Sequence, residues 1–291
     1  MIAFKRYFVD ERASVTRWTP PMGDSGAVSV IGQRPLDGRE TAVWEVPFED
    51  DDFLWTAGLV PDDTSADSEG QMRQILEKYE AILASKGLSI KDNCLRTWIF
   101  VRDIDNNYAG VVKGRKDYFD GIGLTKETHY IASTGIEGNA ADPAVLVTMD
   151  AFAARGIDSR NVKYLQAPGR LNPTHEYGVT FERGTAFTHN GHSHIFISGT
   201  ASIDNSGNVL YVGDVRKQTE RAVGNIRALL QDAPTPTRLE DAEQAIVYLR
   251  NEEDAPAVRE VLAELVPGLN CIMVHGPVCR PTWLVEIECW F

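Results

Sequence analysis

The segment IFISGTASI, Ile195 to Ile203, opens with β-branched and aromatic residues and continues with a run of small ones. This composition predicts a strand that approaches another backbone or a ligand closely at its small residues. A similar segment, FLWTAGLV, occupies Phe53 to Val60, and its Gly58 corresponds to Gly199 of the later segment. Two such strands in one chain indicate an internal repeat.

Three further pairs of segments follow these strands in the same order and at similar spacing. They are helical runs that contain Gln71 and Gln218, the apolar segments WIFVRD and AIVYLR, and the closing segments VLVTMDAF and WLVEIECW. Because order, type and spacing agree, we interpret the chain as two copies of one unit that runs strand, helix, strand, helix, strand. The first copy is predicted within residues 1–154 and the second within 169–291, with a linker at 155–168.

Helix and strand signals define the elements of the second copy. Apolar residues recur at helical spacing from Val215 to Leu230 and again from Ala255 to Val266, where Pro267-Gly268 ends the second helix. Strands are also predicted ahead of each copy, in GAVSVIG and TAVWEVPF before the first and in GVTFERGTAFTH before the second.

The composition is that of an ordinary globular protein, because 43% of the 291 residues are hydrophobic and 24% are charged. The net charge of -13 opposes binding to a phosphate backbone, so no nucleic-acid partner is expected. The N-terminus lacks the apolar core of a signal peptide, and no apolar run approaches the roughly 18 residues of a membrane span. We therefore expect a cytoplasmic location, no membrane partner and four free cysteines.

Neither a metal site nor a cofactor site is predicted. His189, His192 and His194 lie in the loop segment HNGHSH, with no partner cysteine or acid at a recognised metal-ligand spacing. The segment GDSGAVSVIG lacks the Gly-Lys-Ser/Thr ending of a phosphate-binding loop.

The closing strand carries two acids on one face. Side chains alternate along a strand, so Glu286 and Glu288 share a face with Leu284 and Trp290, while the apolar residues between them face the helices. One interpretation is that the acids lie on a solvated sheet face, as is common in antiparallel sheets. The other is that the face is covered, where a carboxyl group is paired or holds its proton more tightly.

The run FISGTASIDNSGNVLYVGDVRKQTERAVGNIRALL, followed by AIVYLRNEEDAPAVREVL and LVEIE, resembles the Rid family, also called YjgF. The resemblance implies an α+β fold of two tandem YjgF/chorismate-mutase-like units, each a mixed β-sheet with two helices packed on one face. It also implies a homo-oligomer, with a trimer favoured, because Rid relatives close their sheets around a threefold axis.

Within that superfamily, the tandem arrangement and the segments GTASI and VCRPTWLVEIE are similar to the chorismatases. Chorismatases hydrolyse the enolpyruvyl ether of chorismate and release pyruvate. The resemblance implies that Glu286, on the last strand, is the proton donor and that Cys279 lines the pocket. An imine or enamine deaminase is the alternative, but Leu269 and Asn270 stand where Rid deaminases have a carboxylate-binding arginine. A noncatalytic ligand-binding protein is a further alternative.

The first copy has an acid at only one of the two matching positions. Thr148 occupies the position of Glu286 in the first copy, whereas Asp150 matches Glu288. The acid common to both copies is therefore interpreted as structural, and Glu286 as the candidate for chemistry.

A small anionic carboxylate substrate requires a local cation and hydrogen-bond donors. Arg280, beside Cys279, and Arg183, in the segment YGVTFERG, are the candidate arginines, because guanidinium groups bind carboxylates in a bidentate manner. Tyr177 of the same segment and the hydroxyls of Thr200 and Ser202 are candidate hydrogen-bonding groups. Each of these residues equally fits a packing or surface role.

Overall fold

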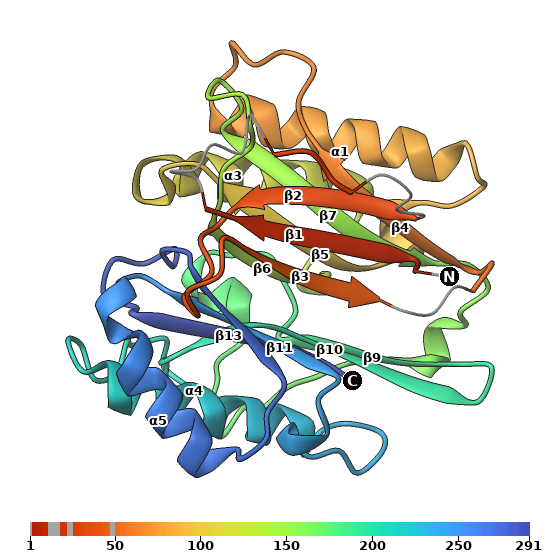
Figure 1. Cartoon of the computed structure of the whole chain (residues 1–291). Helices are drawn as coiled ribbons and strands as arrows, with labels where there is room; N and C mark the ends of the chain where they lie inside the picture. The colour runs from red at the N-terminus through yellow and green to blue at the C-terminus, as the bar shows by residue number, and fades with distance from the viewer. Residues whose placement is uncertain (1, 11–17, 22–25, 47–49) are drawn as a thin grey trace. The chain divides into compact units, whose positions relative to one another are not determined.

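A computed structural model describes residues 2–10, 18–21, 26–46 and 50–291 of the chain, apart from the side chain of Tyr177. The chain forms two compact units, Met1–Tyr130 with Gly135–Gly156, and Ile131–Thr134 with Ile157–Phe291 (Figure 1). The strands and helices of the first unit are β1 (Phe4–Val9), β2 (Ala27–Gly32), β3 (Thr41–Val46), β4 (Phe53–Leu59), α1 (Ser68–Ala84), α2 (Ile90–Asn93), β5 (Cys94–Val101), α3 (Ile104–Ile122), β6 (Ala132–Glu137) and β7 (Val147–Ala154).

The second unit also contains the first three residues of β6, Ala132 to Thr134. Its other strands and helices are β8 (Val162–Tyr164), β9 (Gly184–His189), β10 (His192–Ala201), α4 (Val215–Leu230), β11 (Gln244–Leu249), α5 (Ala255–Leu265), β12 (Cys271–His275) and β13 (Val285–Trp290). Short 3-10 turns lie at η3 (Ser159–Asn161), η4 (Thr174–Tyr177), η5 (Leu239–Asp241) and η6 (Glu252–Asp254).

The order of strands confirms the predicted duplication and fold class. One sheet runs β4-β7-β5-β6, and the other contains β10-β13-β11-β12 in the corresponding order, extended by β9 and β8. The sheets are mixed, because β11 pairs parallel with β12 and antiparallel with β13. The predicted element order was one strand short in each copy. It missed β6 and β12, and a parallel neighbour such as β12 is reached through the crossover helix α5.

Two buried glutamines hold the two copies in the same way. In the first unit, Gln71 donates to the Ala144 carbonyl and accepts the N–H of Leu146, at 3.0 and 2.7 Å. In the second unit, Gln218 donates to the Thr282 carbonyl and accepts the N–H of Leu284, at 2.9 and 2.8 Å. Each glutamine thus ties the first helix of its copy to the segment that leads into the closing strand.

In each copy, the pairing between the first strand and the closing strand has a register shift at two small residues. The β4–β7 register shifts between Thr56 and Leu59, and the β10–β13 register shifts between Ile197 and Thr200. Gly58, inside the first interruption, has φ of +63°, a conformation that glycine adopts without steric cost. The second interruption contains Gly199, so the bulge lies beside the acids of β13.

The helices of the second unit lie together along one face of its sheet (Figure 1). Asp214 caps α4 by accepting the Lys217 N–H at 3.0 Å, and this hydrogen bond holds the pKa of Asp214 below its usual range. The predicted apolar stripe of α4 is buried, and α5 ends at Leu265, one residue before the predicted end. The face of the sheet that carries Glu286 and Glu288 is the opposite one.

The first unit has an additional sheet with the order β2-β1-β3. Strands β2 and β3 lie in predicted segments, whereas β1 was not predicted. Residues 47 and 48 of the segment TAVWEVPF lie outside the described residues. In the second unit, β8 lies within residues 155–168 and pairs with β9. Among the described helices, none combines the length and the apolar character needed to cross a bilayer.

Candidate active site on the closing strand

The two acids of β13 are buried. Glu286 is 5% exposed and Glu288 is 4% exposed, so the interpretation of a solvated sheet face is wrong. Cross-strand neighbours on the same face are Tyr248, opposite Glu286, and Ile246, opposite Glu288. We call this side of the second sheet, with Glu286, Glu288, Tyr248 and Gly199, the acid face. Buried carboxyl groups require hydrogen-bond partners, and these partners define the site.

Glu288 is held by two hydroxyl groups. Tyr248 donates to its Oε1 at 3.1 Å, and Thr134 donates to its Oε2 through a short hydrogen bond. Thr134 Oγ1 also accepts the backbone N–H of Gly199 at 2.9 Å. A carboxyl group fixed at both oxygens by buried donors has little freedom to move toward a ligand.

Glu286 lies directly over the bulge glycine. A Cβ atom built on Gly199 would meet the Glu286 carboxyl group first, with Oε1 nearest and Cδ at 2.7 Å. The next atom would be Thr134 Cγ2, at 3.1 Å. Ala201, the cross-strand partner of Glu286 on β10, is also small. The small residues of IFISGTASI therefore make room for the Glu286 side chain, whereas the sequence predicted a close approach to another backbone or a ligand.

Asp150, the matching acid of the first unit, has an arginine among its partners. Asp150 is fully buried and accepts a hydrogen bond from Arg6 Nε to Oδ2 at 2.8 Å, and Nη2 of Arg6 completes the ion pair at 2.8 Å from the same oxygen. Ser29 donates to the same oxygen at 2.9 Å, and the N–H of Gly58 donates to Oδ1 at 2.8 Å. The guanidinium carbon of Arg6 lies within about 5 Å of the ring centroids of four aromatic side chains, which favours a cation there. These are Phe4, Trp44, Trp98 and Phe100.

This pairing agrees with the structural role predicted for the acid common to both copies. Asp150 is saturated by its own unit, and Glu288 is held by Thr134 and Tyr248. Glu286 has Thr148 at the matching position of the first copy, so the second unit alone places two acids side by side on this face.

Arg183 lies in the bend immediately before β9, in the same unit as Glu286. Thr185, two residues later, pairs with Phe196, and Phe196 pairs with Trp290 of β13. The Arg183 side chain is 6% exposed and donates to the backbone and side-chain oxygens of Asn172, at 3.1 and 3.3 Å. Arg183 is thus a buried cation of the second unit, next to the start of β9.

Arg280 and Cys279 lie in the loop between β12 and β13. The guanidinium group of Arg280 packs over the ring of Trp283 at 4.8 Å and donates to the Gly207 carbonyl at 3.4 Å. Both residues are partly exposed. Arg250, at the end of β11, donates to the carbonyls of Val278 and Trp283 and so helps to fix this loop.

Thr200 and Ser202 point away from the acid face. Thr200 pairs with Ile287, which faces the helices, and its hydroxyl donates to the Ser198 carbonyl at 2.8 Å. Ser202 donates to the Leu210 carbonyl at 2.9 Å. The structure therefore gives both hydroxyls a local backbone role and does not bring them to Glu286. The side chain of Tyr177 lies outside the described part of the structure.

Burial makes most of the cysteine thiols poor nucleophiles. It raises the pKa of Cys94 to about 12, and it also raises the pKa values of Cys271 and Cys289. Cys279 is partly exposed, and all four cysteines are free thiols, as expected.

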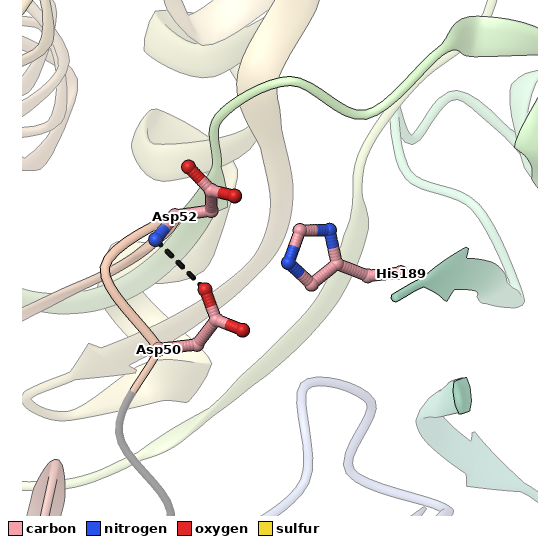
Figure 2. Close-up of side chains that lie close together, drawn as sticks. All are labelled: Asp50, Asp52 and His189. Atoms are coloured by element: carbon pink, nitrogen blue, oxygen red, sulfur yellow. Dashed lines mark hydrogen bonds between the residues drawn. The ribbon is translucent and has the colours of Figure 1, made fainter. Parts of the chain in front are cut away.

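Two further sets of polar residues, the aspartates before β4 and the histidines of the β9–β10 hairpin, make local contacts. Ahead of β4, the N–H of Asp52 donates to Oδ1 of Asp50 at 2.9 Å and closes a tight turn (Figure 2). In the β9–β10 hairpin, His189 pairs in register with His192, and the ring of His194 stacks on Phe187. The absence of a bound metal at these histidines stays a prediction.

Comparisons with known proteins place this geometry in a family. Residues 185–290 match the family described as Endoribonuclease L-PSP. The 3-aminoacrylate deaminase RutC of Acinetobacter baylyi is 30% identical over 97 residues, which are 32% of this chain and 74% of that protein. The chain belongs to the Rid family.

Longer matches connect this Rid protein to a two-repeat branch. The 3-hydroxybenzoate synthase of Streptomyces hygroscopicus is 26% identical over 260 residues, 82% of this chain and 74% of that protein. The chorismatase of Streptomyces rapamycinicus is 28% identical over 213 residues, 66% of this chain and 62% of that protein. A chorismatase crystal structure shares the fold, with a TM-score of 0.75 and 22% identity, and the match covers 99% of this chain and 92% of that one.

Proposed function

We propose that this Rid protein is a chorismatase-like hydrolase that cleaves the enolpyruvyl ether of a small cyclic carboxylate and releases pyruvate. The observation that carries the proposal is the burial of Glu286 over Gly199, on a sheet face where the first copy has threonine. The similarity to the chorismatase and the 3-hydroxybenzoate synthase over most of the chain supports it. Chorismate is the first substrate to test.

Hydrolysis of an enol ether requires a proton donor aimed at carbon. Protonation of the terminal methylene carbon makes it a methyl group and leaves a positive charge shared between the ether oxygen and its carbon. Water adds to that carbon and loses a proton, and the resulting hemiketal collapses to pyruvate and the ring alcohol. Glu286 donates the first proton and, as a carboxylate, accepts the proton of the attacking water, so one group serves both steps.

The substrate carboxylates require a cation in a chain of net charge -13. We favour Arg183 over Arg280 because it is buried and belongs to the same unit as Glu286, directly before β9. Its hydrogen bonds to Asn172 fix the guanidinium group, and a fixed guanidinium binds a carboxylate with less loss of side-chain entropy. We propose that Arg183 contacts substrate, and that Arg280 and Cys279 line the same site from the β12–β13 loop.

Purified protein incubated with chorismate tests the proposal, with pyruvate followed through lactate dehydrogenase and the cyclic product separated by chromatography. We expect one pyruvate for each chorismate consumed. A cyclic product with two ring hydroxyl groups indicates hydrolysis alone. Formation of 3-hydroxybenzoate indicates that one of these hydroxyl groups is also lost as water. Unchanged chorismate after prolonged incubation would contradict the proposal.

An imine or enamine deaminase is the second candidate, favoured by the 30% identity to RutC. The same preparation incubated with freshly generated 2-aminoacrylate distinguishes it, because deamination releases ammonia faster than the uncatalysed reaction. We expect no acceleration. If only this reaction is accelerated, the deaminase replaces the hydrolase.

A trimer is proposed for the native assembly. The mixed sheet of the second unit ends at β12 and β8, and strands at sheet edges offer unpaired backbone groups to neighbouring chains. Light scattering is expected to give three times the 32.3 kDa of one chain, and a mass equal to one chain would contradict the trimer.

A further inference from the structure

We propose that Thr134 is a positioning residue that holds the two acids of β13 in the arrangement needed for proton donation. Nothing in the sequence pattern singled it out, because it lies far from Glu286 along the chain, in the segment ETHYIAST. The inference rests on the proposed function, since it concerns how Glu286 is aimed. It assigns Thr134 no contact with substrate.

The side chain of Thr134 touches each part of the site. Its hydroxyl accepts the N–H of Gly199 at 2.9 Å and donates to Oε2 of Glu288. Its methyl group lies against the same face of Gly199 as the Glu286 carboxyl group. One side chain, 1% exposed, therefore joins the bulge of β10 to Glu288 and forms one wall of the space that Glu286 fills.

The surroundings of Asp150, the matching acid on β7, show the arrangement without a threonine hydroxyl. There the N–H of Gly58 donates straight to Asp150 at 2.8 Å, with no hydroxyl between them. A Cβ atom built on Gly58 would find no heavy atom of the described residues within 4 Å, apart from its chain neighbours. The corresponding space in the second copy contains the Glu286 carboxyl group and the Thr134 methyl group.

The difference assigns a separate task to each acid. At the acids of β13, the hydroxyl of Thr134 accepts the N–H of Gly199, so Glu288 is connected to the bulge through Thr134 and not by a direct hydrogen bond. The space over the glycine is then open to a second acid, from two residues earlier on the same strand. Thr134 thus holds Glu288 by a hydrogen bond and lines the space over Gly199 that the Glu286 carboxyl group occupies.

Removal of the hydroxyl leaves two buried groups without this partner, the N–H of Gly199 and one oxygen of Glu288. Groups of this kind move to find new partners, because an unsatisfied buried donor is costly. A rearranged Gly199 N–H and Glu288 would change the wall and floor on which the Glu286 carboxyl rests. Displacement of a reacting group by about 1 Å is enough to cost roughly 100-fold in rate.

The test compares Thr134→Val, which keeps the shape and loses the hydroxyl, with Thr134→Ser, which keeps the hydroxyl. We expect Thr134→Val to lower kcat for pyruvate release about 10- to 100-fold while KM changes less than about threefold. Thr134→Ser is expected to retain kcat within about threefold of the wild type. Equal kcat values in the two variants, or a wild-type kcat in Thr134→Val, would overturn the inference.

The matched control is Thr219→Val, which removes a buried hydroxyl that donates to the Val215 carbonyl within α4. It loses one hydrogen bond, worth about 1 kcal/mol of stability, and is expected to leave kcat unchanged. Circular dichroism melts establish that all three variants are folded. If Thr134→Val is unfolded, Thr134→Ala and Thr134→Ser are compared in its place, with the same expectation.

A measurement that needs no turnover separates this inference from the proposed function. The side-chain carboxyl carbon of Glu286 is followed by NMR in protein with labelled glutamate and assigned by its loss in Glu286→Gln. We expect its chemical shift to change in Thr134→Val and to stay at the wild-type value in Thr134→Ser and Thr219→Val. If the wild type fails to act on chorismate, the proposed function falls, while an unchanged shift in Thr134→Val overturns the positioning role.

Discussion

Glu286→Gln is expected to lower kcat for pyruvate release from chorismate at least about 100-fold, because a positioned general acid contributes about 100- to 10,000-fold. The amide has the size of the carboxyl group and fits the same space over Gly199, but it has no proton acidic enough to give to carbon. KM is expected to stay within about threefold, since the change removes an interaction made only in the transition state. Steady-state kinetics by the coupled pyruvate assay measure both constants.

The pH dependence gives the same variant a second readout. Only the protonated form of Glu286 donates to carbon, so the wild-type kcat is expected to be highest at low pH and to fall as the pH rises. The fall is expected to disappear in Glu286→Gln, which leaves a slow rate that pH hardly changes. A pH profile with the same shape in both proteins would contradict the assignment.

Glu243→Gln is the matched control. Glu243 belongs to the same unit and precedes β11, and its side chain is exposed, whereas Glu286 is buried. We expect its kcat to equal that of the wild type. If both variants lose activity equally, the loss reflects a general effect of removing a glutamate from this unit, and the role of Glu286 is not supported.

Periodicity and the repeat predicted much of the fold. The strand alternation of β13, the apolar stripes of α4 and α5, and the matched glutamines Gln71 and Gln218 are all properties of short segments. They follow from residue spacing alone, and the structure confirms them. The extra strand β12 was missed because a short apolar run between a helix and a closing strand has no period of its own, and β6 was missed because its sequence, ASTGIE, is mostly small and polar.

The candidate site was predicted less completely, because its parts meet only after folding. Glu286 and Glu288 could be placed on one face from the sequence, and Arg183 lies next to the first residue of β9. The positions of Thr134 and Tyr248 depend on which strands become neighbours, and the hydroxyls of Thr200 and Ser202 depend on the register shift at Gly199. A shift of one residue moves a side chain to the other face, so a bulge defeats simple alternation.

Arg6→Met is expected to destabilise the protein by about 3–5 kcal/mol, the usual cost of leaving one partner of a buried ion pair behind. Both side chains of the pair are fully buried, and the Asp150 carboxyl group would be left with only Ser29 and the Gly58 N–H as partners. Asp150→Asn is expected to cost a similar amount, because the Arg6 cation would then lie among aromatic rings with no carboxylate. Urea unfolding followed by tryptophan fluorescence measures both changes.

The double variant tests whether the pair acts as a unit. Arg6→Met with Asp150→Asn removes both charges, so its loss of stability is expected to be smaller than the sum of the two single losses. The exposed pair of Arg238 and Asp241, with side chains 74% and 48% exposed, is the control, and Arg238→Met is expected to change stability by less than about 1 kcal/mol. Strictly additive losses at Arg6 and Asp150 would show that the two side chains stabilise the first unit independently, and the ion pair would then not explain how the first copy holds its acid.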